Sequence, residues 1–216
     1  MGLRFLIIFL YLPANEIVPK LRMLWNSIPS QLAKENKKFI YGLLREGARA
    51  KDYETAIMWL NDCGLVHKVS RVNSASIPLR AYEDMKAFKL FVLDVGLLGC
   101  MAGLHQHTLI NGNELFVEFK GALTEQYVCQ QLKTVEDTGL YYYTNDKGSC
   151  EVDFVVDTGK HIIPVEVKAQ LNLRAKSLKV YREKFSPEIS VRTAMSDYKK
   201  DDGLTNLPLY AIEQLI

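Results

Sequence analysis

The chain has 216 residues, enough for one large domain or two small ones. Hydrophobic residues make up 48% of it and charged residues 24%, so a core can form without support from disulfides or structural metals. The formal net charge of +2 is too small to indicate nucleic acid or a membrane surface, and such a partner has to be inferred from local charge.

The chain begins with an apolar segment whose role the sequence does not define. Residues 3–12 are apolar apart from Arg4, and this run is too short to span a bilayer. It faintly resembles a signal peptide, but the rest of the chain does not look exported. A strand or helix packed on the core, or a stray start of the reading frame, explains it better. We therefore assign residues 1–14 to no domain and expect no membrane contact.

Residues 15–110 are expected to form a helical domain that ends in a β-ribbon. Apolar residues recur at helical spacing as far as Gly64, and two runs of strand type follow. Three helices followed by a two-stranded ribbon indicate a winged-helix-like domain. The expected elements are helices at residues 16–26, from Ser30, and from the cap Asp52 to Gly64, strands at 65–72 and 88–93, and a helix from the cap Asp94 through Met101.

Residues 111–216 alternate between helical and strand periods, which predicts an α/β domain with a mixed sheet. With the helical half in front of it, the whole chain is α+β. The expected elements are helices at residues 121–132 and 175–185, and strands at 140–144, 151–156, 162–167, 188–193 and 208–212.

The candidate chemistry lies on two strands that flank the turn Asp157-Thr158-Gly159-Lys160. Successive side chains of a strand point to opposite faces, so Glu166 and Lys168 share one face. Asp153 joins them if the connecting loop holds two or four residues, which places it opposite Pro164. A three-residue loop would turn Asp153 to the far face. A joint site therefore predicts the even loop.

Asp153 and Glu166 are candidate ligands of a hard divalent cation. Mg²⁺, or Mn²⁺ in its place, takes oxygen ligands and usually one or two carboxylates. Such an ion would polarise a scissile phosphate and lower the pKa of a bound water. Lys168 would orient that water or neutralise charge that develops in the transition state. Glu151 also shares the strand face with Asp153, and pairing with a lysine is an equally good interpretation for it.

This arrangement resembles the PD-(D/E)XK nuclease superfamily, whose signature is an acidic residue, a hairpin and then Glu-x-Lys. The resemblance implies a restriction-endonuclease-like domain over residues 111–216, with Asp153, Glu166 and Lys168 as catalytic residues. The superfamily often adds a glutamate from a preceding helix, and Glu125 is placed for that catalytic role.

Two further positions bear on the same resemblance. Some members carry a tyrosine in the helix after the motif, for which Tyr181 is a candidate. The proline that usually precedes the first acidic residue is absent here, because Val152 stands in its place.

A longer resemblance covers about residues 20–200. It is to an uncharacterised bacterial and archaeal family that forms the C-terminal region of AAA-type ATP-binding proteins, whose members join a P-loop ATPase to a winged-helix segment and a nuclease-like end. The sequence contains no GxxxxGK[ST] motif, so no ATP site is expected, and an AAA-type ATPase partner or a missing N-terminal domain is implied. The strings that carry it are ARAKDYE (48–54), WLNDCGLV (59–66), FKLFVLDVGLL (88–98) and GALTE (121–125).

Two basic sets are candidate contacts for nucleic-acid phosphates. The first precedes the third helix, where a winged helix would meet a DNA backbone, although surface charge or protein docking explains it equally well. The second follows the Glu-x-Lys motif, and a solvated helix face is its simpler interpretation. The sets are Arg45, Arg49 and Lys51, and Arg174, Lys176 and Lys179.

The cysteines favour a reducing compartment. They form no CxxC pair and no cluster with histidine, which argues against a zinc site or a disulfide framework. Free thiols in the cytoplasm are the simpler interpretation, so we expect a cytoplasmic protein. The four are Cys63, Cys100, Cys129 and Cys150.

The leading hypothesis is a DNA-binding, Mg²⁺-dependent, nuclease-like protein that hydrolyses phosphodiester bonds, that is, a metal-dependent deoxyribonuclease. The alternative is a catalytically inactive regulatory or protein/DNA-interaction module that partners an AAA ATPase. Binding of divalent metal by the purified chain would favour the first and its failure the second. A homo-oligomer is compatible with both.

Overall fold

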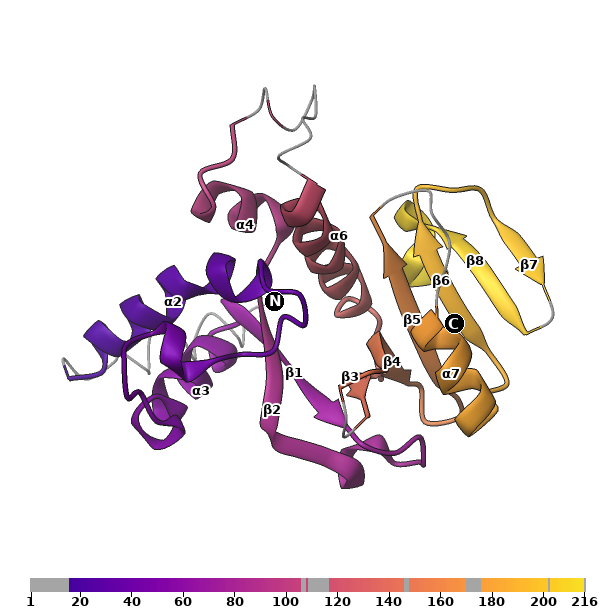
Figure 1. Ribbon diagram of the computed structural model, residues 1–216, viewed down its shortest axis with the longest axis horizontal. Coiled ribbons are helices and arrows are strands. Elements are labelled where there is room, and N and C mark those ends of the chain that lie inside the picture. The colour runs from indigo at the N-terminus through magenta and orange to yellow at the C-terminus, as the bar shows by residue number, and fades with distance from the viewer. Residues whose placement is uncertain are drawn as a thin grey trace.

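A computed structural model describes residues 16–105, 108, 117–145, 148–169, 176–201 and 203–215. Its centre is an eight-stranded mixed sheet in the order β2-β1-β3-β4-β5-β6-β8-β7 (Figure 1). Helices accompany this sheet along the chain, so the predicted mixed α+β class is confirmed. The strands are β1 (Val66–Val72), β2 (Glu83–Val92), β3 (Gly139–Thr144), β4 (Glu151–Asp157), β5 (Ile162–Lys168), β6 (Ser190–Ala194), β7 (Lys199–Asp201) and β8 (Leu204–Pro208).

Helices on both faces of the sheet contribute to its two apolar clusters. The α-helices of the described residues are α2 (Val18–Leu32), α3 (Glu54–Asp62), α4 (Val95–Met101), α6 (Val117–Leu132) and α7 (Lys176–Phe185). Short 3-10 segments are η1 (Tyr41–Leu43), η2 (Ala50–Asp52), η3 (Leu79–Tyr82) and η5 (Leu209–Leu215).

The first half differs from the predicted winged helix in its helices. Ser30 lies inside α2 and does not begin a second helix, because α2 continues past Pro29 to Leu32. Asp52 lies in η2, and the N-cap of α3 is Tyr53, which makes no side-chain cap. Within residues 16–105 the ribbon therefore follows two α-helices and two 3-10 segments, not three helices.

The β1–β2 ribbon is also part of a larger sheet. It is antiparallel, with Val66 opposite Val92, as predicted. Its inner strand β1 also pairs in parallel with β3, where Ser70 lies opposite Tyr141. A winged helix presents such a ribbon as a separate wing, so a winged-helix domain is not confirmed. The predicted boundary at residues 110–111 and the segment 1–14 lie outside the described residues, and the division into two domains stays a prediction.

Two helices begin or end where local signals in the sequence predicted it. The Asp94 side chain accepts a hydrogen bond from the Leu97 N–H at 2.8 Å and caps α4. Gly64 ends α3 with φ of +72°, a conformation that glycine adopts without a steric penalty.

The strand predicted at residues 208–212 is wrong. The strand is β8, which pairs with β6 as far as Pro208, and a 3-10 segment follows because proline donates no ladder hydrogen bond.

The apolar side chains of the sheet pack on two faces. Phe154 and Val165 belong to the larger core, together with residues of α6 and η5. Tyr143 and Val155 belong to a second cluster with Tyr181 of α7. Figure 1 shows α7 in front of the strands, on the side away from η5. The point where β4 and β5 meet is therefore covered from both sides.

Two further observations bear on the class of protein. No helix of the described residues combines the length and the apolar character that crossing a membrane requires. All four cysteines are free thiols, as expected, and Cys129 and Cys150 are buried.

Candidate functional site

The β4–β5 hairpin has the even loop that a joint site requires. Asp157 lies opposite Ile162, so the loop between them holds the four residues 158–161. The register differs from the predicted one by two residues, because Pro164 lies opposite Val155. Continued along the strands, this register places Asp153 opposite Glu166 and not opposite Pro164. The charges of the two predicted metal ligands are close enough to interact.

A β-bulge directs Asp153 toward β5. On β4, Val155 pairs with Tyr141 and Val152 pairs with Tyr143, so residues 153–154 lie opposite the single residue Tyr142. An extra residue of this kind bends the strand and redirects a side chain. The bulge also breaks the alternation by which Glu151 and Asp153 were expected to share a face.

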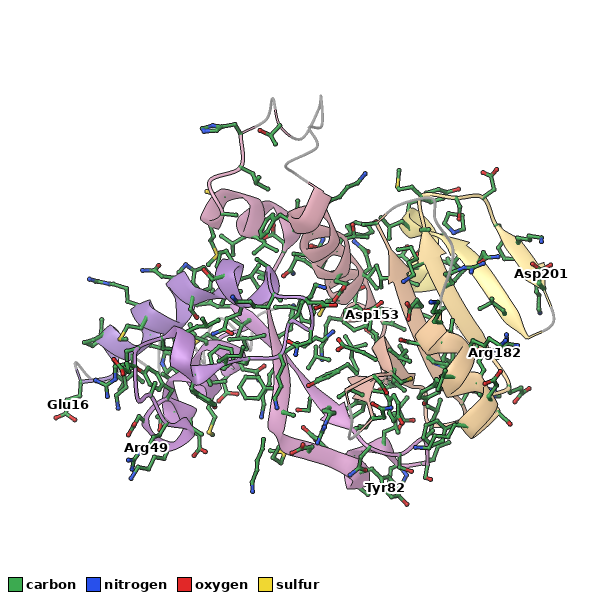
Figure 2. The ribbon with its side chains drawn as sticks, in the orientation of Figure 1. Glu16, Arg49, Tyr82, Asp153, Arg182 and Asp201 are labelled. Atoms are coloured by element: carbon green, nitrogen blue, oxygen red, sulfur yellow. The ribbon has the colours of Figure 1, made fainter. Side chains whose placement is uncertain are left out.

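Asp153 takes the place of a ladder partner for β5. The pairing of β4 with β5 ends at Phe154 and Val165. Just beyond it, the Asp153 Oδ2 accepts a hydrogen bond from the Val167 N–H at 2.8 Å. Figure 2 shows Asp153 near the middle of the molecule, between the helical half and the last strands. The carboxyl group is thus fixed at the point where the two strands separate.

Glu166 and Lys168 share one face of β5, as predicted. The Lys168 Nζ lies 2.7 Å from the Glu166 Oε1. Glu166 is buried, and its second oxygen, Oε2, has no hydrogen-bond partner. Burial raises the pKa of the Glu166 carboxyl, and Lys168 offsets only part of this shift. Lys168 is partly exposed and can therefore reach a ligand in solvent.

Glu125 reaches the same region from α6. It is buried, and its Oε1 lies 2.8 Å from the Nζ of Lys37. Its Oε2 lies 3.6 Å from the Nζ of Lys89. Burial alone would raise the pKa of this carboxyl, but the two ammonium groups outweigh burial and hold the pKa below its usual value. Glu125 is therefore an ionised neighbour of Asp153 and Glu166.

Lys89 of β2 is the member of the site that the sequence did not predict. Its side chain is fully buried, and its Nζ lies 2.7 Å from the Oε1 of Glu151. Burial favours the neutral amine, but Glu125, Glu151 and Asp153 hold the pKa of Lys89 above its usual value, so the ammonium stays charged. A lysine inside the apolar run Phe88–Val92 was a signal, because a strand interior accepts a charge only with partners. Lys37, in a turn with φ of 51°, gave no such signal.

These side chains form one group, which we call the charged cluster. If every member ionises, one negative charge stays unmatched, since four carboxylates face three ammonium groups. The carboxylates are Glu125, Glu151, Asp153 and Glu166, and the ammonium groups are Lys37, Lys89 and Lys168.

Asp153 is the member that lacks an ammonium partner. Burial raises the pKa of its carboxyl well above the usual range, and nearby Glu125 and Glu166 add to the shift. Lys89 and the N–H of Val167 act in the opposite direction without outweighing it. A proton or a cation at Asp153 would balance the charge. Among the described residues, no group of three or more His, Cys, Asp or Glu side chains is arranged to hold a metal ion.

The two predicted basic sets lie on different parts of the molecule. Arg49 is labelled at the lower left of Figure 2, on the far side of Asp153 from Arg182 of α7. Arg45, in the turn after η1, and Lys51, in η2, are also exposed. The first set therefore does not surround the charged cluster.

The second set lies on α7. Lys176 and Lys179 are exposed there, and Lys179 lies 3.8 Å from Glu183 in a surface ion pair. The helix packs on β4 and β5, on the face of β5 that carries Glu166. Arg174 lies outside the described residues.

Tyr181 of α7 packs in the core between this helix and the sheet. Its ring centroid lies 5.0 Å from that of Tyr143 and 4.8 Å from that of Phe185. Its hydroxyl is buried with no hydrogen-bond partner, and burial raises its pKa. Packing accounts for this tyrosine.

Comparison with known families gave two matches. Residues 9–108 match the model of a domain of unknown function (DUF8612), and residues 120–212 match another domain of unknown function (DUF4143). Neither the curated proteins nor the solved structures gave a match to this chain. The chain is thus similar to one domain of unknown function over each half.

Proposed function

We propose that the chain hydrolyses phosphodiester bonds in DNA with a divalent metal ion, as the nuclease-like part of an AAA-ATPase-associated protein. The observation that carries the proposal is the placement of Asp153 by the bulge, beside the Glu166–Lys168 pair, with a negative charge that no ammonium group matches. This is the combination of two carboxylates and a lysine that the PD-(D/E)XK resemblance requires.

The residues present fit a single Mg²⁺ or Mn²⁺ ion. The Glu166 Oε2 is buried without a hydrogen-bond partner, and Asp153 lacks a matching positive charge. Mg²⁺ usually takes one or two protein carboxylates and keeps waters or substrate phosphate in its other positions, so two ligands suffice. When bound, the ion would polarise the phosphate and lower the pKa of a water.

The chain's own side chains would do the rest. Lys168 is held 2.7 Å from Glu166 and is partly exposed, so it can neutralise charge on a phosphate at the same face. The negative charge of Glu125 would stabilise the positively charged groups of the site, among them Lys37 and Lys89. Exposed Lys176 and Lys179 on α7 would bind the DNA backbone beside it.

A nuclease assay with Mg²⁺ or Mn²⁺ on single- and double-stranded DNA tests the proposal. We expect Lys168→Ala and Glu166→Ala to reduce cleavage by about 100-fold or more. Lys200→Ala, a lysine exposed on the edge strand β7, is the matched control and should cleave like the wild type. Equal cleavage by the wild type and both site variants, or none by the wild type, would refute the proposal.

A second function is favoured by one observation. Lys89 already neutralises part of the cluster from inside the protein, which is the arrangement expected of a structural ion network. The chain would then be a catalytically inactive regulatory or interaction module that partners an AAA ATPase. Absence of divalent-metal binding by the wild type, together with absence of cleavage, is the result that selects this function.

A further inference from the structure

We propose that the Lys89 ammonium is a built-in cation that fills a place between Glu125 and Glu151 which a divalent metal ion would otherwise take. The inference rests on the proposed function in one respect, namely that Asp153 and Glu166 supply a separate place for a metal ion. The charged cluster would then hold two cations, of which one is part of the protein.

The position of the ammonium group carries the inference. The Lys89 Nζ lies 2.7 Å from the Glu151 Oε1 and 3.6 Å from the Glu125 Oε2. It also lies 5.0 Å from the ring centroid of Tyr142, whose face attracts cations. Carboxylates from β4 and α6 thus converge with an aromatic ring on one fully buried positive charge.

An unused ligand atom at the same place supports the inference independently. Glu125 is 6% exposed, and its Oε2 is buried without a hydrogen-bond partner. At 3.6 Å from the Lys89 Nζ, this oxygen contributes charge but no hydrogen bond. A smaller cation at the position of the ammonium group could bind it directly, as hard divalent ions bind carboxylates.

Electrostatics explains why the two cations exclude each other. Buried charges of like sign at close range repel strongly where little water screens them. A divalent ion between Glu125 and Glu151 would lie against the Lys89 ammonium, which has no route to solvent because its side chain is fully buried. The place becomes available when the charge of residue 89 is removed.

Counting bound ions tests the inference. Mn²⁺ is titrated into the purified full chain and into Lys89→Met, which keeps an unbranched side chain without the charge, and free Mn²⁺ is followed by its electron paramagnetic resonance signal. We expect the variant to bind one Mn²⁺ more than the wild type. Lys37→Met removes an equal charge from Glu125 at the partly exposed end of the cluster and should bind as many ions as the wild type.

Each outcome then has one meaning. Equal counts for the wild type and Lys89→Met, or an extra ion in Lys37→Met as well, would overturn the inference. The count of the wild type tests the proposed function separately: one ion agrees with the Asp153–Glu166 site, and none contradicts it whatever Lys89→Met binds. If Lys89→Met lacks the far-ultraviolet circular dichroism of a folded chain, Mn²⁺ should restore it, and failure to restore it overturns the inference.

Discussion

Asp153→Asn should stabilise the metal-free protein at neutral pH and weaken its binding of metal. The asparagine keeps the shape of the side chain and an oxygen that can accept the hydrogen bond from the Val167 N–H. What it removes is the one negative charge in the cluster that lacks an ammonium partner. The variant therefore separates the structural effect of this charge from its proposed function as a metal ligand.

The magnitude follows from the neighbours of Asp153. Glu125 and Glu166 repel its charge and Lys89 attracts it, which leaves one uncompensated repulsion. One such repulsion across about 6 Å, at an effective dielectric constant of ~20, is roughly 3 kcal/mol. Asp153 is partly exposed, so solvent screening reduces the expected gain to on the order of 1–2 kcal/mol.

The raised pKa of Asp153 also determines the sign of the pH dependence. Because the pKa of Asp153 is higher in the folded than in the unfolded chain, the folded state binds the proton more tightly. The wild type therefore loses stability as pH rises from the usual aspartate pKa of about 4 through the raised pKa of the folded state. Asparagine does not titrate, so the advantage of Asp153→Asn should grow from pH 5 to pH 8. The Asp153 and Glu166 carboxylates repel each other, so the loss of the Asp153 charge also lessens the rise of the Glu166 pKa, which favours the variant in the same direction.

Urea unfolding with a chelator present measures this difference. The fluorescence of Trp25 and Trp59, on α2 and α3, reports the transition. A wild type that is more stable than Asp153→Asn at pH 8 would contradict this expectation. So would a difference in unfolding free energy between the two proteins that does not change with pH. A Mn²⁺ titration of the same samples should show weaker binding by the variant.

Three further substitutions test the packing and hydrogen bonds that position the site. Gln126→Ala should lower the free energy of unfolding by about 2–4 kcal/mol, because the buried amide donates to the Val92 carbonyl at 2.7 Å and accepts from its N–H at 3.0 Å. A urea midpoint like that of the wild type would contradict this. Asp94→Ala should lower that free energy by about 1 kcal/mol, since it removes the cap that accepts from the Leu97 N–H, and a larger loss would point to a further role. Tyr181→Phe should leave thermal stability within about 1 kcal/mol and DNA cleavage unchanged, because the hydroxyl has no partner, and a loss of cleavage would place Tyr181 in the site.

Several features were predictable because they depend on neighbours in the sequence. The alternation of a strand placed Glu166 and Lys168 on one face. A joint site with Asp153 required an even loop, and the loop holds the four residues 158–161. The cap at Asp94 and the end of α3 at Gly64 follow from side-chain and backbone preferences of single residues. The edge strand β7 escaped prediction for the same reason, since its exposed residues Lys199–Asp201 show no apolar alternation.

Other features were decided only by contacts between distant parts of the chain. The direction of Asp153 depends on the bulge, which lies in the pairing of β4 with the distant strand β3. The winged-helix interpretation is not confirmed, because β1 pairs in parallel with β3. No local signal in the sequence encodes that pairing. Such pairings follow from which surfaces can be buried together, not from the strands themselves.

The charged cluster shows the same division most clearly. The sequence by itself determined that Asp153, Glu166 and Lys168 come from one hairpin, and it offered Glu125 as a fourth member. Only the tertiary structure brought Lys89 from β2 to the carboxylates of Glu125 and Glu151. A lysine in an apolar strand signals that partners must exist, because a buried charge is unstable alone. Only the tertiary fold, which brings the Lys89 side chain to carboxylates of α6 and β4, decides which partners they are.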